Sequence, residues 1–130
     1  MADRKRILIA DDDPDLLSLL EMALAGEGYA VAAVSDGKEA FSRALSETFD
    51  VVLLDIMMPY IDGYHVAYEL TSRLGPRAPK ILLMTSRDTA REQGVALISG
   101  AEEVLQKPFE LAALKQTIAR LLETTQPSPP

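Results

Sequence analysis

The chain contains no cysteine and no tryptophan, and its only histidine is His65. Without cysteine, neither a disulfide framework nor a thiolate metal site can form. A single histidine also leaves any histidine-based metal cluster or catalytic triad incomplete. The ligands expected for a metal ion are therefore oxygen atoms, which suit hard cations such as Mg²⁺.

Basic residues are also scarce, with 13 Lys and Arg against 20 Asp and Glu and a net charge of −7. Because nucleic-acid backbones require a basic footprint, direct binding to nucleic acid is not expected. The first apolar run, Ile7–Ala10, has four residues and is too short for a signal peptide or a membrane span. No glycine-rich phosphate loop follows it, which disfavours a flavodoxin-like cofactor carrier. A cytoplasmic protein without membrane contact is expected.

The length of 130 residues fits one domain. Five short apolar runs alternate with segments of helical periodicity. The expected strands are Ile7–Ala10, Ala30–Val34, Val51–Leu54, Ile81–Met84 and Glu103–Leu105. The expected helices are Pro14–Ala25, Lys38–Glu47, Tyr64–Leu74, Thr89–Ser99 and Glu110–Glu123. Strict alternation predicts an α/β fold, a doubly wound five-stranded parallel sheet with helices on both faces. The domain is expected over residues 1–124, with 125–130 a Pro-rich disordered tail or the start of a linker.

Polar residues follow the predicted strands, at the edge where open α/β sheets bind ligands. They are Asp11, Asp12, Asp13, Asp55, Thr85, Ser86 and Lys107. Clustered carboxylates repel and need a cation, and Mg²⁺, which Mn²⁺ can replace, suits them. One acid can then attack phosphorus and form an acyl phosphate. Lys107 can neutralise phosphoryl charge, Thr85 can donate a hydrogen bond to a phosphoryl oxygen, and small Ser86 leaves room for that group or for water.

Simpler structural interpretations exist for individual residues. Asp13 is expected to cap the first helix, and Asp62 with Gly63 to begin the third. Tyr64 and Tyr68 share a helix face and are expected to pack against the sheet margin. Asp55 or Lys107 alone would be unremarkable, so the prediction of a site rests on their joint placement.

Four segments together resemble the response-regulator receiver family, of which CheY is a single-domain member. They are residues 7–14 (ILIADDDP), 55–63 (DIMMPYIDG), 83–86 (LMTS) and 100–109 (GAEEVLQKPF). The resemblance covers residues 5 to 124 and is specific as a set. It implies the CheY-like (βα)₅ fold with strand order 2-1-3-4-5.

The resemblance implies roles for individual residues. Asp55 is the phosphoacceptor and a metal ligand, Asp12 binds Mg²⁺ most directly, and Asp11 acts through water. The backbone carbonyl of Met57 completes the protein ligands. Such a domain catalyses only its own phosphorylation and slow dephosphorylation, and is not an enzyme in the usual sense.

The resemblance further implies that Thr85 is the switch hydroxyl and Lys107 the phosphate-pairing lysine, with a cis bond to Pro108. It implies a sensor histidine kinase or phosphotransfer protein as donor, and an effector or a covalently linked output domain as recipient. A homodimer through the helix at 89–99, the strand at 103–105 and the last helix is a further expectation.

The sequence departs from the family at Val104, where receivers commonly carry Tyr or Phe. An aromatic ring that rotates inward is therefore missing, and we expect movement of the 86–91 loop to relay the shift of Thr85 instead. Two rival functions remain open. One is a phosphatase of the haloacid dehalogenase type, in which Asp11 and Asp13 form the Asp-x-Asp pair. The other is a phosphorylation-independent interaction module, for which Val104 is the only support.

Overall fold

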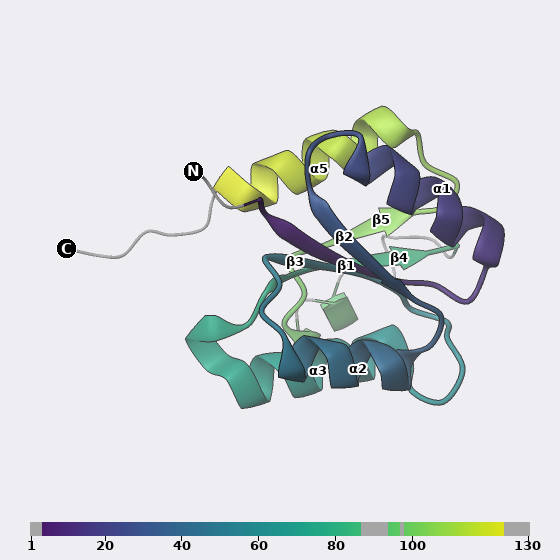
Figure 1. The fold of residues 1–130 in the computed structure, drawn as a ribbon. Helices are drawn as coiled ribbons and strands as arrows, with labels where there is room; N and C mark the ends of the chain where they lie inside the picture. The colour runs from purple at the N-terminus through teal and green to yellow at the C-terminus, as the bar shows by residue number, and fades with distance from the viewer. Residues whose placement is uncertain (1–3, 87–93, 97, 124–130) are drawn as a thin grey trace.

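The structure is a computed structural model that describes residues 4–86, 94–96 and 98–123. Its centre is a parallel sheet of five strands in the order β2-β1-β3-β4-β5 (Figure 1). The strands are β1 (Arg6–Ala10), β2 (Ala30–Val34), β3 (Val51–Asp55), β4 (Lys80–Thr85) and β5 (Glu103–Gln106). The predicted fold class and strand order are confirmed.

Helices cover both faces of this sheet (Figure 1). On one face lie α1 (Pro14–Ala25) and α5 (Leu111–Glu123), and on the other α2 (Gly37–Ser46) and α3 (Gly63–Leu74). A short 3₁₀ helix, η1 (Gly75–Arg77), follows α3. Of the helix predicted at 89–99, residues 94–96 and 98–99 are helical, while 89–93 and 97 lie outside the described residues. The predicted tail, 125–130, also lies outside them.

The two hydrophobic cores follow from the alternation of side chains along each strand. In β1, Ile7 and Ile9 face α1 and α5, whereas Leu8 and Ala10 face α2 and α3, and all four are fully buried. Both faces of the central strands are therefore covered, which explains why these strands read as continuous apolar runs. Their carboxyl ends carry the polar residues of the predicted site.

Aspartates cap three helices. Asp13 accepts hydrogen bonds from the backbone N–H groups of Asp15 and Leu16, at 3.1 and 3.3 Å, which confirms the predicted cap of α1. Asp36 and Asp62 cap α2 and α3 in the same way, each accepting from the N–H three residues on, at 2.7 and 2.8 Å. These caps satisfy N–H groups that have no partner within the helix.

Several predicted boundaries differ by one residue from the observed ones. Asp55 is the last residue of β3 and Thr85 the last residue of β4, whereas both were expected just beyond their strands. Each therefore has a backbone fixed by the sheet. Tyr64 packs against the core as expected, but the prediction for Tyr68 was wrong, since this residue is 55% exposed. Tyr68 lies on the outward side of α3.

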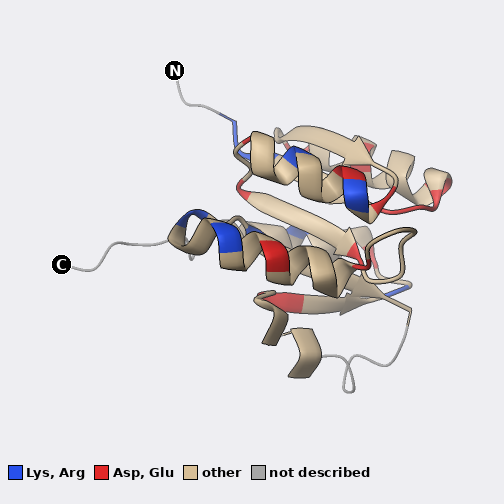
Figure 2. Cartoon of the chain, turned by 90° about the horizontal axis from the view of Figure 1, so that it is seen from below, with Lys and Arg blue, Asp and Glu red and all other residues tan. Residues whose placement is uncertain are grey.

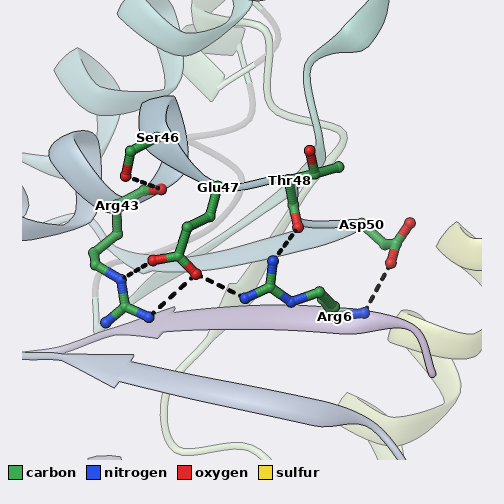
Figure 3. A network of polar contacts seen from close by, with 6 residues as sticks. All are labelled: Arg6, Arg43, Ser46, Glu47, Thr48 and Asp50. Atoms are coloured by element: carbon green, nitrogen blue, oxygen red, sulfur yellow. Dashed lines mark hydrogen bonds and ion pairs between the residues drawn. The ribbon is translucent and has the colours of Figure 1, made fainter. Parts of the chain in front are cut away.

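A polar network joins α2 to the amino ends of β1 and β3 (Figure 3). The Arg6 guanidinium donates to Glu47 at 2.7 Å and to the Thr48 carbonyl at 2.9 Å, while its backbone N–H donates to Asp50 at 2.8 Å. Arg43 donates to the other oxygen of Glu47 at 2.5 Å. The carboxyl end of α2 is thus tied to the sheet at the edge opposite to the predicted site.

Charges of both signs are interspersed along α2 and α3, which lie side by side (Figure 2). These two helices therefore present a mixed surface and not a basic stripe. None of the helices among the described residues has both the length and the apolar character needed to cross a bilayer.

Candidate functional site

The predicted site lies at the carboxyl edge of the sheet. Asp11 follows β1 directly, and Asp55 ends the neighbouring strand β3. Thr85 ends β4, and Lys107 follows β5. Because all strands are parallel, the four residues meet at one edge although 96 positions separate Asp11 from Lys107.

Three carboxylates converge at this edge. One oxygen atom from each of Asp11, Asp12 and Asp55 lies within 4.8 Å of the others. Asp11 is fully buried, Asp55 is 6% exposed, and Asp12 is exposed to solvent. The cluster is therefore open on the side of Asp12 and closed by protein behind Asp11.

Lys107 is a cation that the two buried acids, Asp11 and Asp55, share. Its ammonium group lies 2.8 Å from Oδ2 of Asp11 and 3.3 Å from Oδ2 of Asp55. The preceding chain is held by the sheet, since the backbone N–H of Lys107 donates to the Thr85 carbonyl at 2.6 Å. The bond from Lys107 to Pro108 is cis.

The remaining oxygens of the buried acids are engaged by the backbone. Oδ1 of Asp11 accepts from the N–H of Asp13 at 2.9 Å, and Oδ1 of Asp55 accepts from the N–H of Met57 at 3.3 Å. These contacts hold the two loops after β1 and β3 close to the carboxylates. The Asp13 carboxylate is engaged at the cap of α1, and the acidic cluster consists of Asp11, Asp12 and Asp55.

One lysine does not balance three carboxylates. Burial, followed by the charge of Asp11, raises the pKa of Asp55 from 3.8 to about 6, against the opposing effect of Lys107. Burial acts to lower the pKa of Lys107, but its hydrogen bond to Asp11 and the charges of Asp55 and Asp11 raise it overall. The site therefore holds a firmly protonated lysine and a carboxylate whose charge is costly.

The donor set fits a hard divalent cation. It consists of carboxylate oxygens from two residues in the loop after β1 and one at the end of β3, with an exposed side through Asp12. Mg²⁺ binds through one or two carboxylates, keeps several waters and tolerates an open site. A triad of this kind is typical of Mg²⁺ sites, and its uncompensated negative charge favours a cation.

The other predicted residues lie in or shortly after β3, β4 and β5. Thr85 is fully buried and Ser86 beside it is exposed, while Met57 is 54% exposed in the loop after β3. Val104 lies in β5 opposite Leu83 of β4 and is 6% exposed, within the core that α2 and α3 cover. Of the 86–91 loop, only Ser86 lies within the described residues.

Two glycines lie near the site, and the sequence gave neither of them a role in it. Gly37 and Gly63 are buried first residues of α2 and α3, and both lie against backbone of the segment from Asp55 to Ile61. An Asp-Gly pair stands at each helix start: the pair at 62 and 63 was predicted to begin the third helix, and the pair at 36 and 37 was given no role at the site.

An acidic triad with one lysine at the carboxyl edge of a 2-1-3-4-5 parallel sheet defines a CheY-like α/β domain. The family model of the response regulator receiver domain matches residues 7–119, and the chain therefore belongs to this family. Receiver domains are phosphoacceptor signalling domains of two-component systems, not conventional enzymes.

Known relatives agree. The chain is 40% identical over 122 residues to the response regulator MprA of Mycolicibacterium vanbaalenii, covering 94% of this chain and 52% of that protein. It thus spans about half the length of the curated relatives it matches. A CheY-like receiver domain protein of Methanospirillum hungatei superposes with a TM-score of 0.87 at 26% identity, covering 94% of this chain and 96% of the other. The response regulator TrrA of Thermotoga maritima, solved in complex with Mg²⁺-BeF, gives 0.81 at 35% identity, covering 90% and 98%.

Proposed function

We propose that Asp55 accepts a phosphoryl group from a phosphohistidine of a sensor kinase or phosphotransfer protein, with Mg²⁺ bound beside it. The observation that carries this proposal is the convergence of Asp11, Asp12 and Asp55 around Lys107 at one edge of the sheet. TrrA, a structural relative, was solved with Mg²⁺-BeF, which supports the same chemistry here.

The reaction is an in-line transfer. A carboxylate oxygen of Asp55 attacks phosphorus, the bond from phosphorus to the donor imidazole breaks, and the leaving imidazole takes up a proton. The sheet fixes the Asp55 backbone, and the N–H of Met57 orients its Oδ1. Asp11, Asp12, Asp55 and the Met57 carbonyl would hold a bound Mg²⁺. The ion would supply positive charge to the transferring phosphoryl group.

Lys107 and Thr85 act on the product. The Lys107 ammonium, already shared by Asp11 and Asp55, pairs with the charge that the phosphoryl group brings. Thr85, at the end of the strand next to Asp55, donates its hydroxyl to a phosphoryl oxygen, and Ser86 leaves room beside it. Val104 is too small for an aromatic-type rotation, so the shift of Thr85 travels through the backbone after β4.

The output lies beyond this domain. Because the matched response regulators are about twice as long as this chain, we infer that phosphorylation controls either a linked output region or a separate effector. A homodimer through the helix predicted at 89–99, β5 and α5 would provide one route. The ion pair between Glu103 on β5 and Arg120 on α5, at 2.9 Å, holds two of these elements together.

The test is intact mass after incubation with acetyl phosphate, with and without Mg²⁺, for the wild type and for Asp55→Asn. The proposal predicts a gain of one phosphoryl group that requires Mg²⁺ and is absent in Asp55→Asn. A gain that persists in Asp55→Asn would refute Asp55 as acceptor. No gain, even with a panel of phosphorylated sensor kinases, would favour a phosphorylation-independent interaction module.

A further inference from the structure

The loop from residue 56 to 62, here called the β3–α3 loop, contains Met57, whose backbone N–H donates to Oδ1 of Asp55 at 3.3 Å. It is closed at its base, because the N–H of Gly63 donates to the Ile56 carbonyl at 2.9 Å. At its tip the N–H of Ile61 donates to the Pro59 carbonyl at 2.9 Å, and Tyr60 takes the left-handed conformation, with φ 72°. A short loop pinned at its base transmits any displacement of Ile61 to the stretch that holds Met57.

Gly37 is the residue against which the tip of this loop rests. A Cβ atom at position 37 would overlap the carbonyl oxygen of Ile61 and lie 2.8 Å from its carbonyl carbon. Gly37 is buried and is not among the glycines with positive φ, so backbone freedom does not explain it. Glycine is needed here because the first turn of α2 and the loop backbone touch directly.

Helix α2 is poorly placed to yield if this contact became too tight. Ala40 is fully buried against the core and Ala44 is 4% exposed. The far end of the helix is tied to β1 through Arg43, Glu47 and Arg6 (Figure 3). The loop, with Met57 and Tyr60 largely exposed, has the weaker support and would be the part that moves.

We propose that Gly37 is a positioning residue for the metal site: its missing side chain lets α2 seat the β3–α3 loop so that Met57 faces the acidic cluster. This inference rests on the proposed Mg²⁺-dependent function. It assigns a role in cation binding to a helix that contributes no ligand. The overlap involves backbone atoms, so smaller side chains at position 61 cannot relieve it.

The test compares Gly37→Ala with Gly26→Ala. Gly26 has φ −64° and ψ −21°, and a Cβ there would meet nothing closer than 3.4 Å, which makes it a matched control. Mg²⁺ dissociation constants come from amide shifts in NMR titrations, and folding from urea unfolding without Mg²⁺. Gly37→Ala is expected to weaken Mg²⁺ binding on the order of tenfold, as loss of outer support for metal ligands does. Gly26→Ala should bind as the wild type does.

Ile61→Ala sharpens the comparison. Adding Gly37→Ala to Ile61→Ala should weaken Mg²⁺ binding as much as it does in the wild-type background, because the backbone overlap remains. Full restoration of binding in the double variant would overturn the backbone contact as the cause. Folded Gly37→Ala protein with wild-type Mg²⁺ affinity would overturn the proposal, because α2 and not the loop would then have moved.

The wild type provides a test that does not depend on Gly37→Ala folding. During a Mg²⁺ titration the amides of Gly37 and Ile61 should shift with the same midpoint as that of Met57, while that of Gly26 stays in place. An unshifted Gly37 amide would contradict the proposal. If no amide of the wild type responds to Mg²⁺, the proposed function fails, which is a separate outcome from failure of Gly37 alone.

Discussion

The amino and carboxyl ends of the sheet shift the pKa of a carboxyl group in opposite directions. At the amino end, Glu47 lies between Arg6 and Arg43, and hydrogen bonds from Arg43 and Arg6 lower its pKa. At the carboxyl end, three carboxylates lie together and two of them, Asp11 and Asp55, pair with Lys107. Burial together with the charge of Asp11 raises the pKa of Asp55 to about 6. Ionisation is favoured at the first end and opposed at the second.

The difference separates a structural tie from a chemical site. The charges at the amino end are paired with one another and need no ligand. The carboxyl end is short of positive charge, and this is the condition under which a cation binds and a carboxylate acts as a nucleophile. The uncompensated negative charge of the site costs stability, and the buried strands around the site offset that cost.

The largest effect is expected from removing the shared lysine. Lys107→Met would leave the fully buried Asp11 without its cation and should lower the free energy of unfolding by about 3 kcal/mol at pH 8 without Mg²⁺. Lys115→Met is the matched control, since Lys115 pairs with Glu27 at the surface, at 3.3 Å, and should cost less than about 1 kcal/mol. Urea unfolding measures both, and equal losses would contradict the difference between buried and surface pairs.

Mg²⁺ should relieve the same imbalance. At a free concentration of about 100 times its dissociation constant, it should raise the free energy of unfolding by about 2.7 kcal/mol through binding to the folded state alone. Asp12→Asn should remove most of this gain, because Asp12 is the exposed member of the acidic cluster. Thermal or urea unfolding with and without MgCl₂ measures this gain in stability. If the gain is the same in Asp12→Asn as in the wild type, Asp12 is excluded as a ligand.

The pH dependence of stability should reveal the cost of the Asp55 charge. With a folded pKa of about 6 against 3.8, the folded state binds more protons in this interval, so the Asp55 contribution to stability declines as pH rises from about 4 to 6. Asp55→Asn removes this cost. Without Mg²⁺ it should be more stable than the wild type by about 1–2 kcal/mol at pH 8 and nearly equal at pH 4. A difference independent of pH would show that Asp55 ionises without penalty.

The smallest effect is expected at the amino end. Glu47→Gln removes a surface carboxylate, so its effect on stability should be smaller than that of Lys107→Met. The effect should also decrease in 1 M NaCl, because the Debye length there is about 3 Å and the charges are screened. Its Mg²⁺ affinity and its phosphorylation by acetyl phosphate should equal those of the wild type. A loss of Mg²⁺ binding in this variant would show that the amino and carboxyl ends of the sheet are energetically coupled, which would contradict this account.

Much of the fold and of the site could be predicted from the sequence. The apolar runs alternate with helical segments regularly enough to give a parallel sheet. The strand order that the family resemblance implies makes β1 and β3 neighbours, and the rule that ligands bind at carboxyl ends then brings Asp11 and Asp55 together. The position of Lys107 after the last strand followed in the same way. These predictions depend on topology, for which the alternation gave the parallel sheet and the resemblance gave the strand order.

Details that depend on side-chain packing could not be predicted from the sequence. Lys107 lies closer to Asp11 than to Asp55, at 2.8 against 3.3 Å, and no spacing along the chain encodes this. The contact of Gly37 with Ile61 joins the start of α2 to the β3–α3 loop, and the two meet because α2 and α3 pack side by side. The exposure of Tyr68 depends on the rotation of α3 about its axis, for which helical periodicity alone gave the wrong side.

The most direct test of the central claim is to locate the phosphoryl group itself. The protein would be phosphorylated with acetyl phosphate and Mg²⁺, treated with borohydride to reduce the acyl phosphate to an alcohol, digested and sequenced by tandem mass spectrometry. Asp55, as the carboxylate held in line beside the cation site, should appear as homoserine at position 55. Homoserine at position 11 or 12 in place of 55 would contradict the assignment of the acceptor.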